Sequence, residues 1–374
     1  MSICNTQRVI VVGAGITGLT TAFELSKQGY KVILISKCFP TDEKYSYEYA
    51  SAWAGAHFTP VPTYSEKDVL EMKLNRTTYR YFKELAEEFP ESSVKFVKGI
   101  HYLEEPLSAY YSETNAGYNS SNLENFKTLS PEIIPFDDIK FGCEYDSWVA
   151  NAPHLLKFLF NRLRIFYNVK AFQLDVMSIR QIFEASHCFS GLHDILGVIN
   201  CTGRGLQYDG GYDSDTFFVR TQTINISKPI CPNISTIPYY KKTVIIQLKD
   251  GSSVYVIERP IDGGFSIGGS RQINDFCPFA REAETREIIE NAKKYFKELL
   301  NAVGEFDIKK VNVSIRAVRK GGLKLSKVLI KEQGNKFLID AYGAGAMGYE
   351  LSFGIAEKVV EMVNDKYENI SAKF

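Results

Sequence analysis

A glycine-rich turn between an apolar strand and a helix constrains this chain more than any other feature. Residues Arg8 to Val12 form a β-branched run that is apolar on both faces, which is typical of a buried parallel strand. The turn follows directly at Gly13 to Gly18 (GAGITG), and helical spacing then continues to Gln28. Lys31 to Ser36 has the pattern of a second strand. The segment is therefore predicted to be one βαβ unit.

The G-x-G-x-x-G turn is the kind of site at which a dinucleotide pyrophosphate binds. Its glycines permit a tight turn and let backbone N–H groups and the helix dipole face an anion. An acidic residue about 20 residues further on usually accepts a hydrogen bond from a ribose, but Ser36 and Lys37 stand there instead. The pattern favours a flavin dinucleotide with altered ribose contacts over NAD. A purely structural βα turn is the alternative.

The rest of the chain predicts an α/β protein with an inserted second sheet. Helices are expected at Glu66 to Glu88, Ala152 to Tyr167, Ala283 to Ala302 and Tyr349 to Asn364, and short strands from Phe217 to Gly269. We predict a Rossmann-like dinucleotide-binding domain with a parallel sheet from residues 1–60, 140–210 and 335–374. An α+β substrate domain with an antiparallel sheet is predicted from residues 61–139 and 211–334.

Composition excludes several classes of partner. Lys plus Arg and Asp plus Glu each total 44 among 374 residues, so no basic excess points to nucleic acid or to a membrane surface. The chain holds no apolar run of about 18 residues and no secretory signal pattern, so a protein that is neither secreted nor membrane-spanning is expected. The seven cysteines show neither paired spacing nor a metal-site pattern, which favours a reducing compartment.

Five further motifs occur in order along the chain. They are Ser51 to His57 (SAWAGAH), Asn200 to Gly203 (NCTG), Tyr255 to Pro260 (YVIERP), Ile315 to Arg319 (IRAVR) and Tyr342 to Tyr349 (YGAGAMGY). With the glycine turn they span almost the whole chain, and they resemble the motifs of the D-amino-acid oxidases and the related D-aspartate oxidases. The resemblance implies that the dinucleotide-binding domain is a FAD-binding domain.

The resemblance also implies that FAD binds without a covalent bond. It puts the pyrophosphate at the glycine turn, the flavin ring beside Gly55 and Ala56 and beside the Gly345 to Glu350 loop, and Val176 near the adenine. The expected cofactor-binding residues are Gly13, Ala14, Gly15, Ile16, Thr17, Gly18, Ser36, Lys37, Ser51, Ala52, Gly55, Ala56, His57, Val176, Thr202, Gly203, Arg316, Gly345, Ala346, Met347, Gly348 and Tyr349.

A D-amino acid presents an α-carboxylate, which a planar guanidinium binds with two parallel hydrogen bonds. The resemblance selects Arg316 for this role, with the Tyr255 hydroxyl as a second donor. Arg319 is expected on the opposite face of the same strand, in solvent. Glu350 is expected either to hold the substrate ammonium or to disfavour reduced, anionic flavin through its charge.

The segment Gly268 to Gln272 (GGSRQ) is similar to the GGTRQ of D-aspartate oxidases, whose arginine pairs with the second carboxylate of the substrate. By that resemblance Arg271 selects acidic D-amino acids, since a neutral side chain leaves the charge unpaired. A solvated turn residue is the alternative for Arg271. Acidic and neutral preferences therefore both stay open.

The activity implied by the resemblance is oxidative deamination. Hydride passes from Cα to flavin N5, O2 reoxidises the flavin to give H2O2, and the imino acid hydrolyses to a 2-oxo acid and ammonia. Hydride transfer needs orientation more than a base, so no residue is assigned as a general base. His57 lies in the flavin segment, but a hydrogen-bonded structural role is favoured for it over catalysis. No metal site is expected, because the histidines lack ligand spacing.

Three positions depart from the family pattern. Ala317 replaces a proline, Thr221 replaces the glycine of an R-G-Q-T motif, and Glu350 stands where a fungal relative has glutamine. These changes bear on rate more than on fold. A glycine or sarcosine oxidase, which needs no Arg271, and a non-catalytic FAD-fold protein are the alternatives to a D-amino-acid oxidase.

The last residues, Ala372-Lys373-Phe374, resemble a degenerate form of the peroxisomal address S-K-L. A peroxisomal location, with an import receptor as a partner, is therefore one expectation, and a cytoplasmic location is the other. A homodimer is also considered.

Overall fold

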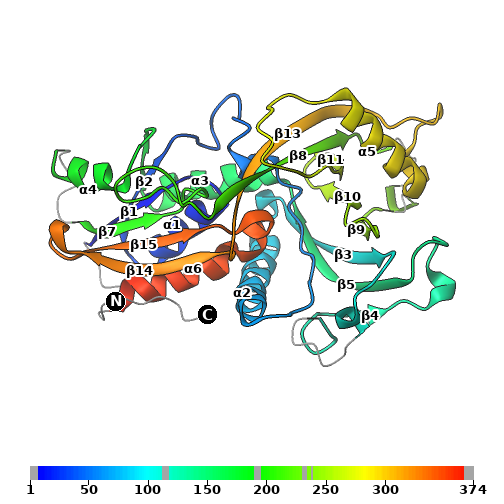
Figure 1. Ribbon diagram of the computed structural model, residues 1–374, viewed down its shortest axis with the longest axis horizontal. Helices are drawn as coiled ribbons and strands as arrows, with labels where there is room; N and C mark the ends of the chain where they lie inside the picture. The colour runs from blue at the N-terminus through cyan, green and yellow to red at the C-terminus, as the bar shows by residue number, and fades with distance from the viewer. Residues whose placement is uncertain (1–6, 112–117, 189–194, 230–233, 237–238, 366–374) are drawn as a thin grey trace.

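The computed structural model describes residues 7–111, 118–188, 195–229, 234–236 and 239–365, in which two sheets lie side by side (Figure 1). The tripeptide Ala372-Lys373-Phe374 lies outside these described residues. A long helix, α2 (Glu66–Glu88), lies between the two sheets in this view. Its first turn is fixed by a capping box, in which Ser65 and Asp68 each accept from the other's backbone N–H.

The first sheet has six strands among the described residues, in the order β14-β15-β7-β1-β2-β6. All neighbours are parallel except β14 and β15. The strands are β1 (Arg8–Val12), β2 (Lys31–Ser36), β6 (Lys170–Gln173), β7 (Ile195–Asn200), β14 (Lys324–Ile330) and β15 (Lys336–Tyr342).

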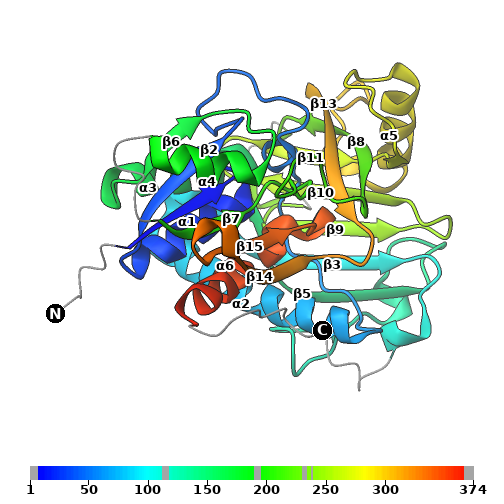
Figure 2. The same ribbon diagram turned by 60° about the vertical axis from the view of Figure 1, so that its left-hand side comes forward.

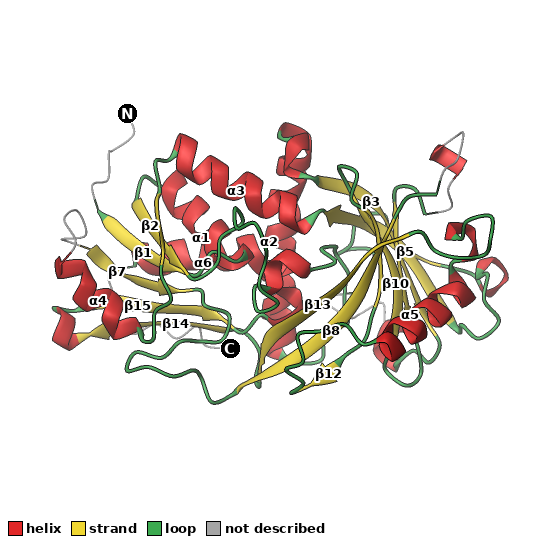
Figure 3. Ribbon diagram, turned by 90° about the horizontal axis from the view of Figure 1, so that it is seen from above, coloured by secondary structure: helices red, strands yellow, loops and turns green. Residues whose placement is uncertain are grey.

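Helices cover both faces of this sheet (Figure 3). On one face lie α1 (Ile16–Lys27), α3 (Ala152–Phe166) and α6 (Gly348–Asn364), and on the other lies α4 (Ile179–Cys188). Along β1, Val9 and Val11 join the core under α1 and α6, whereas Ile10 and Val12 join the core that contains Ile179 of α4. Because successive side chains point to opposite faces, a strand covered on both sides must be apolar throughout.

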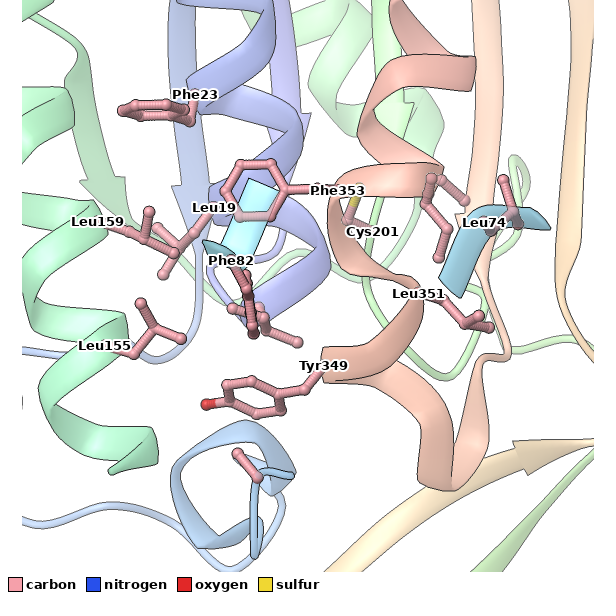
Figure 4. Close-up of a cluster of buried hydrophobic side chains, with 14 of the residues drawn as sticks. Leu19, Phe23, Leu74, Phe82, Leu155, Leu159, Cys201, Tyr349, Leu351 and Phe353 are labelled. Atoms are coloured by element: carbon pink, nitrogen blue, oxygen red, sulfur yellow. The ribbon is translucent and has the colours of Figure 1, made fainter. Parts of the chain in front are cut away.

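The larger core is built from helices that meet at Phe353 of α6 (Figure 4). The Phe353 ring stacks on Tyr81 with ring centroids 4.8 Å apart and meets Phe82 edge-on at 5.8 Å. Phe23 of α1 contacts the same ring at 6.3 Å. The aromatic residues of α2 therefore pack against the helices of the first sheet, which joins the two halves of the molecule.

The second sheet has nine strands among the described residues, in the order β12-β8-β11-β10-β9-β3-β5-β4, with β13 paired to β8. All pairs are antiparallel except β3 and β9. β13 runs alongside β8 (Figure 2) and leads into β14 of the first sheet. The strands are β3 (Val94–Leu103), β4 (Lys127–Thr128), β5 (Phe141–Ala150), β8 (Thr216–Ile226), β9 (Lys242–Gln247), β10 (Ser253–Arg259), β11 (Gly264–Gly268), β12 (Gln272–Ile273) and β13 (Ile308–Arg319).

The predicted fold class is confirmed: a mainly parallel sheet with helices on both faces accompanies a mainly antiparallel second sheet. One helix boundary is wrong, because α5 (Glu282–Tyr295) ends where Phe296 takes a non-helical conformation. The domain ranges stay a prediction. Two strands pair with the sheet of the other predicted domain: β5, in the predicted dinucleotide-binding range, belongs to the second sheet, and β14, in the predicted substrate range, belongs to the first.

Three further expectations can be compared with the described part of the chain. Cys38, Cys143, Cys201 and Cys277 are free thiols there. No described helix has both the length and the apolar character that a membrane span needs. Among the described residues, no group of histidine, cysteine and acidic side chains is arranged to hold a metal ion.

Candidate active site

A cavity of about 360 Å³ lies at the carboxyl ends of β1, β2, β7 and β15, where α/β sheets bind their ligands. Its wall also includes Ile315, Arg316 and Ala317 of β13, so both sheets contribute to it. Many of the predicted cofactor residues line this cavity: Gly13, Ala14, Gly15, Ile16, Thr17, Ser36, Lys37, Ser51, Val176, Thr202, Gly203, Arg316, Gly345 and Gly348.

The glycines of the turn have different structural roles. Gly13 has a φ of +106°, in the region that favours glycine. A Cβ at Gly18 would lie 1.9 Å from the Gly13 carbonyl oxygen, so Gly18 allows the helix to approach the strand. A Cβ at Gly15 would meet only the Ser51 side chain, at 3.0 Å from its hydroxyl, and Gly203 has open space. Bare backbone thus lines the cavity, as the phosphates of a dinucleotide require.

Two serines support the turn from neighbouring segments. The Ser36 hydroxyl accepts the Ala14 N–H at 3.1 Å, and the Ser51 hydroxyl accepts the Ile16 N–H at 3.0 Å. The buried Tyr349 hydroxyl donates to the Ser51 carbonyl at 2.8 Å. Segments far apart in the sequence therefore fix the geometry of the glycine turn, and Tyr349 acts behind the cavity wall.

The end of the cavity beside β2 contains carboxylates that the sequence analysis missed. Glu48 and Asp175 line the cavity, and Lys37 pairs with Asp175 at 3.0 Å between Nζ and Oδ2. The sequence analysis searched only the position directly after β2, where Ser36 and Lys37 stand. Acidic groups reach this end from two other segments, which no local spacing rule could identify.

Arg316 contributes a guanidinium to the same cavity. Its Nη1 donates to Thr221 Oγ1 at 3.0 Å, and its buried Nε has no hydrogen-bond partner in the described part of the chain. Burial lowers the pKa of Arg316, and the nearby Arg271 lowers it further, whereas Tyr255 raises it. The site therefore presents a half-buried cation whose buried Nε has donor capacity left over, as a carboxylate ligand requires.

Tyr255 lies close to Arg316 but does not line the main cavity. Burial raises the pKa of its phenol to about 12, and the charge of Arg316 opposes that change. A Cβ at Gly268 would lie 2.5 Å from the Tyr255 hydroxyl, so this hydroxyl sits over the Gly268-Gly269 turn. Arg271, which follows that turn, is exposed. Their roles as substrate ligands stay predictions.

Arg319 was expected in solvent, and that expectation is wrong. Its side chain is 18% exposed and donates to Asp213 and to Asp215, each at 2.9 Å. The Tyr342 hydroxyl also donates to Asp213, at 2.8 Å. Arg319 is thus a structural ion-pair residue, on the strand face away from Arg316.

Glu350 is half-buried and lies outside the main cavity. Its Oε2 accepts from Asn75 Nδ2 of α2 at 2.9 Å, and its carboxyl also accepts from the Thr59 backbone N–H. Burial raises its pKa to about 8, against the lowering effect of these bonds and of Arg76. The group is therefore mainly uncharged at neutral pH. Its contact with the substrate ammonium stays a prediction.

His57 has the environment of a structural residue. Its Nδ1 bonds to Thr243 Oγ1 at 2.9 Å and its Nε2 to Thr59 Oγ1 at 3.3 Å. Burial, with a smaller effect of His101, lowers its pKa to about 3. An imidazole that stays neutral and bonded on both sides is a poor proton carrier, in agreement with the favoured interpretation.

The remaining predicted cofactor residues do not line the cavity. Gly55 packs closely against Ile257, and Met347 lines a small separate cavity with Asn75 and Arg76. The others in this group are Gly18, Ala52, Ala56, His57, Ala346 and Tyr349.

Arg204 lines the cavity and was not predicted. Its guanidinium lies 3.8 Å from the ring centroid of Tyr212 and 4.6 Å from that of Phe218. Stacking of this kind is typical of arginine. Its place in the sequence, directly after the predicted cofactor residues Thr202 and Gly203, could have identified it.

Comparison with known proteins places this geometry among flavoproteins. The family model described as FAD dependent oxidoreductase matches residues 8–362. A D-aspartate oxidase from Talaromyces thermophilus is 30% identical, with 95% of each chain covered. A D-amino-acid oxidase from Schizosaccharomyces pombe is 28% identical over 93% of each chain.

Solved structures share the fold at low sequence identity. Glycine oxidase from Geobacillus kaustophilus has a TM-score of 0.69 and 17% identity, covering 97% of this chain and 96% of that one. The L-alpha-glycerophosphate oxidase of Mycoplasma pneumoniae, solved with FAD bound, has a TM-score of 0.66 and 15% identity, covering 98% and 97%.

Proposed function

The chain belongs to the family of FAD dependent oxidoreductases, and from this premise we propose that it is an oxidase of D-amino acids with a preference for acidic ones. FAD would be held without a covalent bond by the glycine turn and the cavity around it, and it would supply the acceptor for a hydride from the substrate Cα, with O2 taking up the electrons to give H2O2. The imino acid then hydrolyses to a 2-oxo acid and ammonia.

The observation that carries the proposal is the position of Arg316. This guanidinium lines the same cavity as the glycine turn, and its buried Nε has no partner among the described residues. An α-carboxylate would supply that partner and put the substrate Cα inside the cofactor cavity. Fixing a substrate in this way favours hydride transfer, because orientation removes much of the entropic barrier.

Arg271 supports the preference for acidic substrates. Its positive charge lowers the pKa of Arg316, and a dicarboxylic amino acid that bound Arg316 through its α-carboxylate could offer its second carboxylate to Arg271. The D-aspartate oxidase of Talaromyces thermophilus, at 30% identity, also supports this preference. A substrate with a neutral side chain would leave the Arg271 charge without an anion. The site would therefore disfavour that substrate relative to an acidic one.

Oxidation of neutral D-amino acids is the second candidate. The relative from Schizosaccharomyces pombe, named D-amino-acid oxidase, is 28% identical over 93% of each chain. Arg271 is exposed, so water can solvate it when the substrate carries no second carboxylate.

An anaerobic absorption spectrum tests the proposal. The purified protein is titrated with D-Asp, then in separate samples with D-Ala and with L-Asp as a control. Bleaching of the oxidised-flavin band by D-Asp at lower concentration than by D-Ala is the expected result. A band that neither D-amino acid bleaches would contradict the oxidase proposal, and bleaching by D-Ala alone would favour the second candidate.

A further inference from the structure

Arg220 of β8 is a fully buried cation whose guanidinium is saturated with hydrogen bonds. Its side chain is 0% exposed, and it pairs with Glu284 of α5 at 2.7 Å between Nη1 and Oε2. The remaining acceptors come from the segment around β12 and from its own strand: Gln272 Oε1, Gln222 Oε1 and the carbonyl oxygens of Cys277 and Phe279. A buried charge is tolerated when it is paired and bonded in this way.

This network fixes the residues on both sides of Arg271. The Ser270 N–H donates to the Gln222 carbonyl at 3.2 Å, and the Ser270 hydroxyl donates to Glu284 at 3.0 Å. On the other side, the Gln272 side chain accepts from Arg220 at 3.2 Å. Arg271 itself is exposed, and none of the ion pairs in the described part of the chain includes it. The backbone is therefore held while the Arg271 guanidinium is left available.

The carboxylates of this network are already neutralised by other arginines. Glu284 accepts from Arg220 through one oxygen and from Arg281 through the other, the second at 3.0 Å. Asp275 binds Arg281 through both oxygens, at 2.5 and 3.0 Å. If either carboxylate were free, it would compete for the Arg271 guanidinium, because Ser270 brings Arg271 next to Glu284 and Asp275 follows four residues later in the same short segment.

We propose that Arg220 and Arg281 are positioning residues that reserve Arg271 for the side-chain carboxylate of the substrate, by occupying Glu284 and Asp275. The inference rests on the proposed function. It adds that selectivity for acidic substrates depends on two arginines that do not touch the substrate.

The exposed member of the pair gives the test. The Arg281 side chain is 41% exposed, so Arg281→Ala removes its charge without opening a core cavity. It removes the only arginine that pairs with Asp275 among the described residues, so Oδ2 is freed while Oδ1 still accepts the Cys277 N–H, and Glu284 keeps its pair with Arg220. KM for D-Asp is expected to rise about fivefold or more, with kcat and the KM for D-Ala within about twofold of wild type. A purely structural role would change both substrates alike.

Two further variants test rescue. Arg281→Lys keeps the charge beside Asp275, and the double variant Arg281→Ala with Asp275→Asn removes the freed carboxylate. Each is expected to bring KM for D-Asp back within about twofold of wild type. An equal loss for D-Asp and D-Ala in Arg281→Ala, or a loss that the double variant does not reverse, would overturn the proposal.

The matched control is Arg286→Ala on the same helix. Arg286 pairs with the exposed Glu282 at 2.8 Å and has no bond to the network. Arg286→Ala is expected to leave the KM values for D-Asp and D-Ala unchanged. A rise in KM for D-Asp in this variant would show that the loss of net positive charge causes the effect, and would contradict the proposal. Arg271→Ala distinguishes failure of the positioning role from failure of the proposed function. If Arg271→Ala raises KM for D-Asp selectively while Arg281→Ala does not, the proposed function stands and the positioning role of Arg281 fails.

Discussion

The Arg316 guanidinium is half-buried, and its buried Nε has no hydrogen-bond partner among the described residues. Hydrogen bonds to charged groups contribute about 1.5–3 kcal/mol, so losing the pair with an α-carboxylate should reduce kcat/KM about 10- to 150-fold. We expect this loss in Arg316→Lys, because an ammonium cannot form the parallel pair of bonds. Steady-state peroxide release measures it.

The control for this prediction is Arg319→Lys. Arg319 lies on the same strand but pairs with Asp213 and Asp215. Arg319→Lys should lower the stability of the protein and leave kcat/KM close to that of the wild type. If Arg316→Lys kept wild-type kcat/KM while retaining its flavin spectrum, Arg316 would not be the carboxylate ligand.

The raised pKa of Glu350 predicts that the stability of the protein depends on pH. Its pKa is raised from about 4.5 to about 8 by burial. Between these values the unfolded chain releases the proton that the folded chain keeps, so this group lowers stability as pH rises through that window and adds no further change above it. Glu350→Gln cannot ionise, and its Tm should therefore gain on the wild type from about pH 5 to about pH 8.

Thermal unfolding of the two proteins at several pH values, each with saturating FAD, measures this difference. Glu357→Gln serves as the control, since Glu357 lies on the same helix with a side chain that is 41% exposed. Its Tm should run parallel to that of the wild type. A constant gap between Glu350→Gln and wild type across the pH range would show that Glu350 is ionised in the folded protein.

At the scale of the element, α6 owes its position to Phe353. This fully buried ring contacts aromatic residues of α1 and α2. Phe353→Ala should therefore destabilise the protein by about 3–5 kcal/mol, through lost burial and the cavity left behind. Denaturant unfolding measures the loss, and Phe172→Ala on the edge strand β6, where the ring is 42% exposed, should change stability by less than about 0.5 kcal/mol. Equal losses in the two variants would contradict the assigned core.

Elements with strong periodicity could be predicted from the sequence, and irregular ones could not. The bounds of α2, Glu66–Glu88, follow from its amphipathic pattern and its Ser65 cap. The end of α5 was missed because Phe296 leaves the helix for a packing position in the core, which no local pattern reports. In the site, the glycine turn is local in sequence, whereas Glu48, Asp175 and Arg204 reach the cavity from separate loops.

At the scale of the whole molecule, the cavity joins segments from both sheets. Its wall includes the glycine turn near one end of the chain, Thr202, Arg316 of β13 and Gly345. A ligand that contacts all of them binds the folded chain alone, and at 100 times its Kd it adds about 2.7 kcal/mol of stability. FAD should therefore raise Tm by several degrees, and riboflavin, which lacks the diphosphate, should raise it less.

Gly15→Val tests whether this stabilisation comes from the cavity. Gly15 has an ordinary φ of −72°, so valine is tolerated by the backbone there. Its side chain would project toward Ser51 into the space at the turn. The variant should keep a Tm near that of the FAD-free wild type and lose most of the rise on adding FAD. A full rise in Gly15→Val would mean that the dinucleotide binds elsewhere, because a valine at the turn blocks the close approach of phosphate to backbone N–H groups.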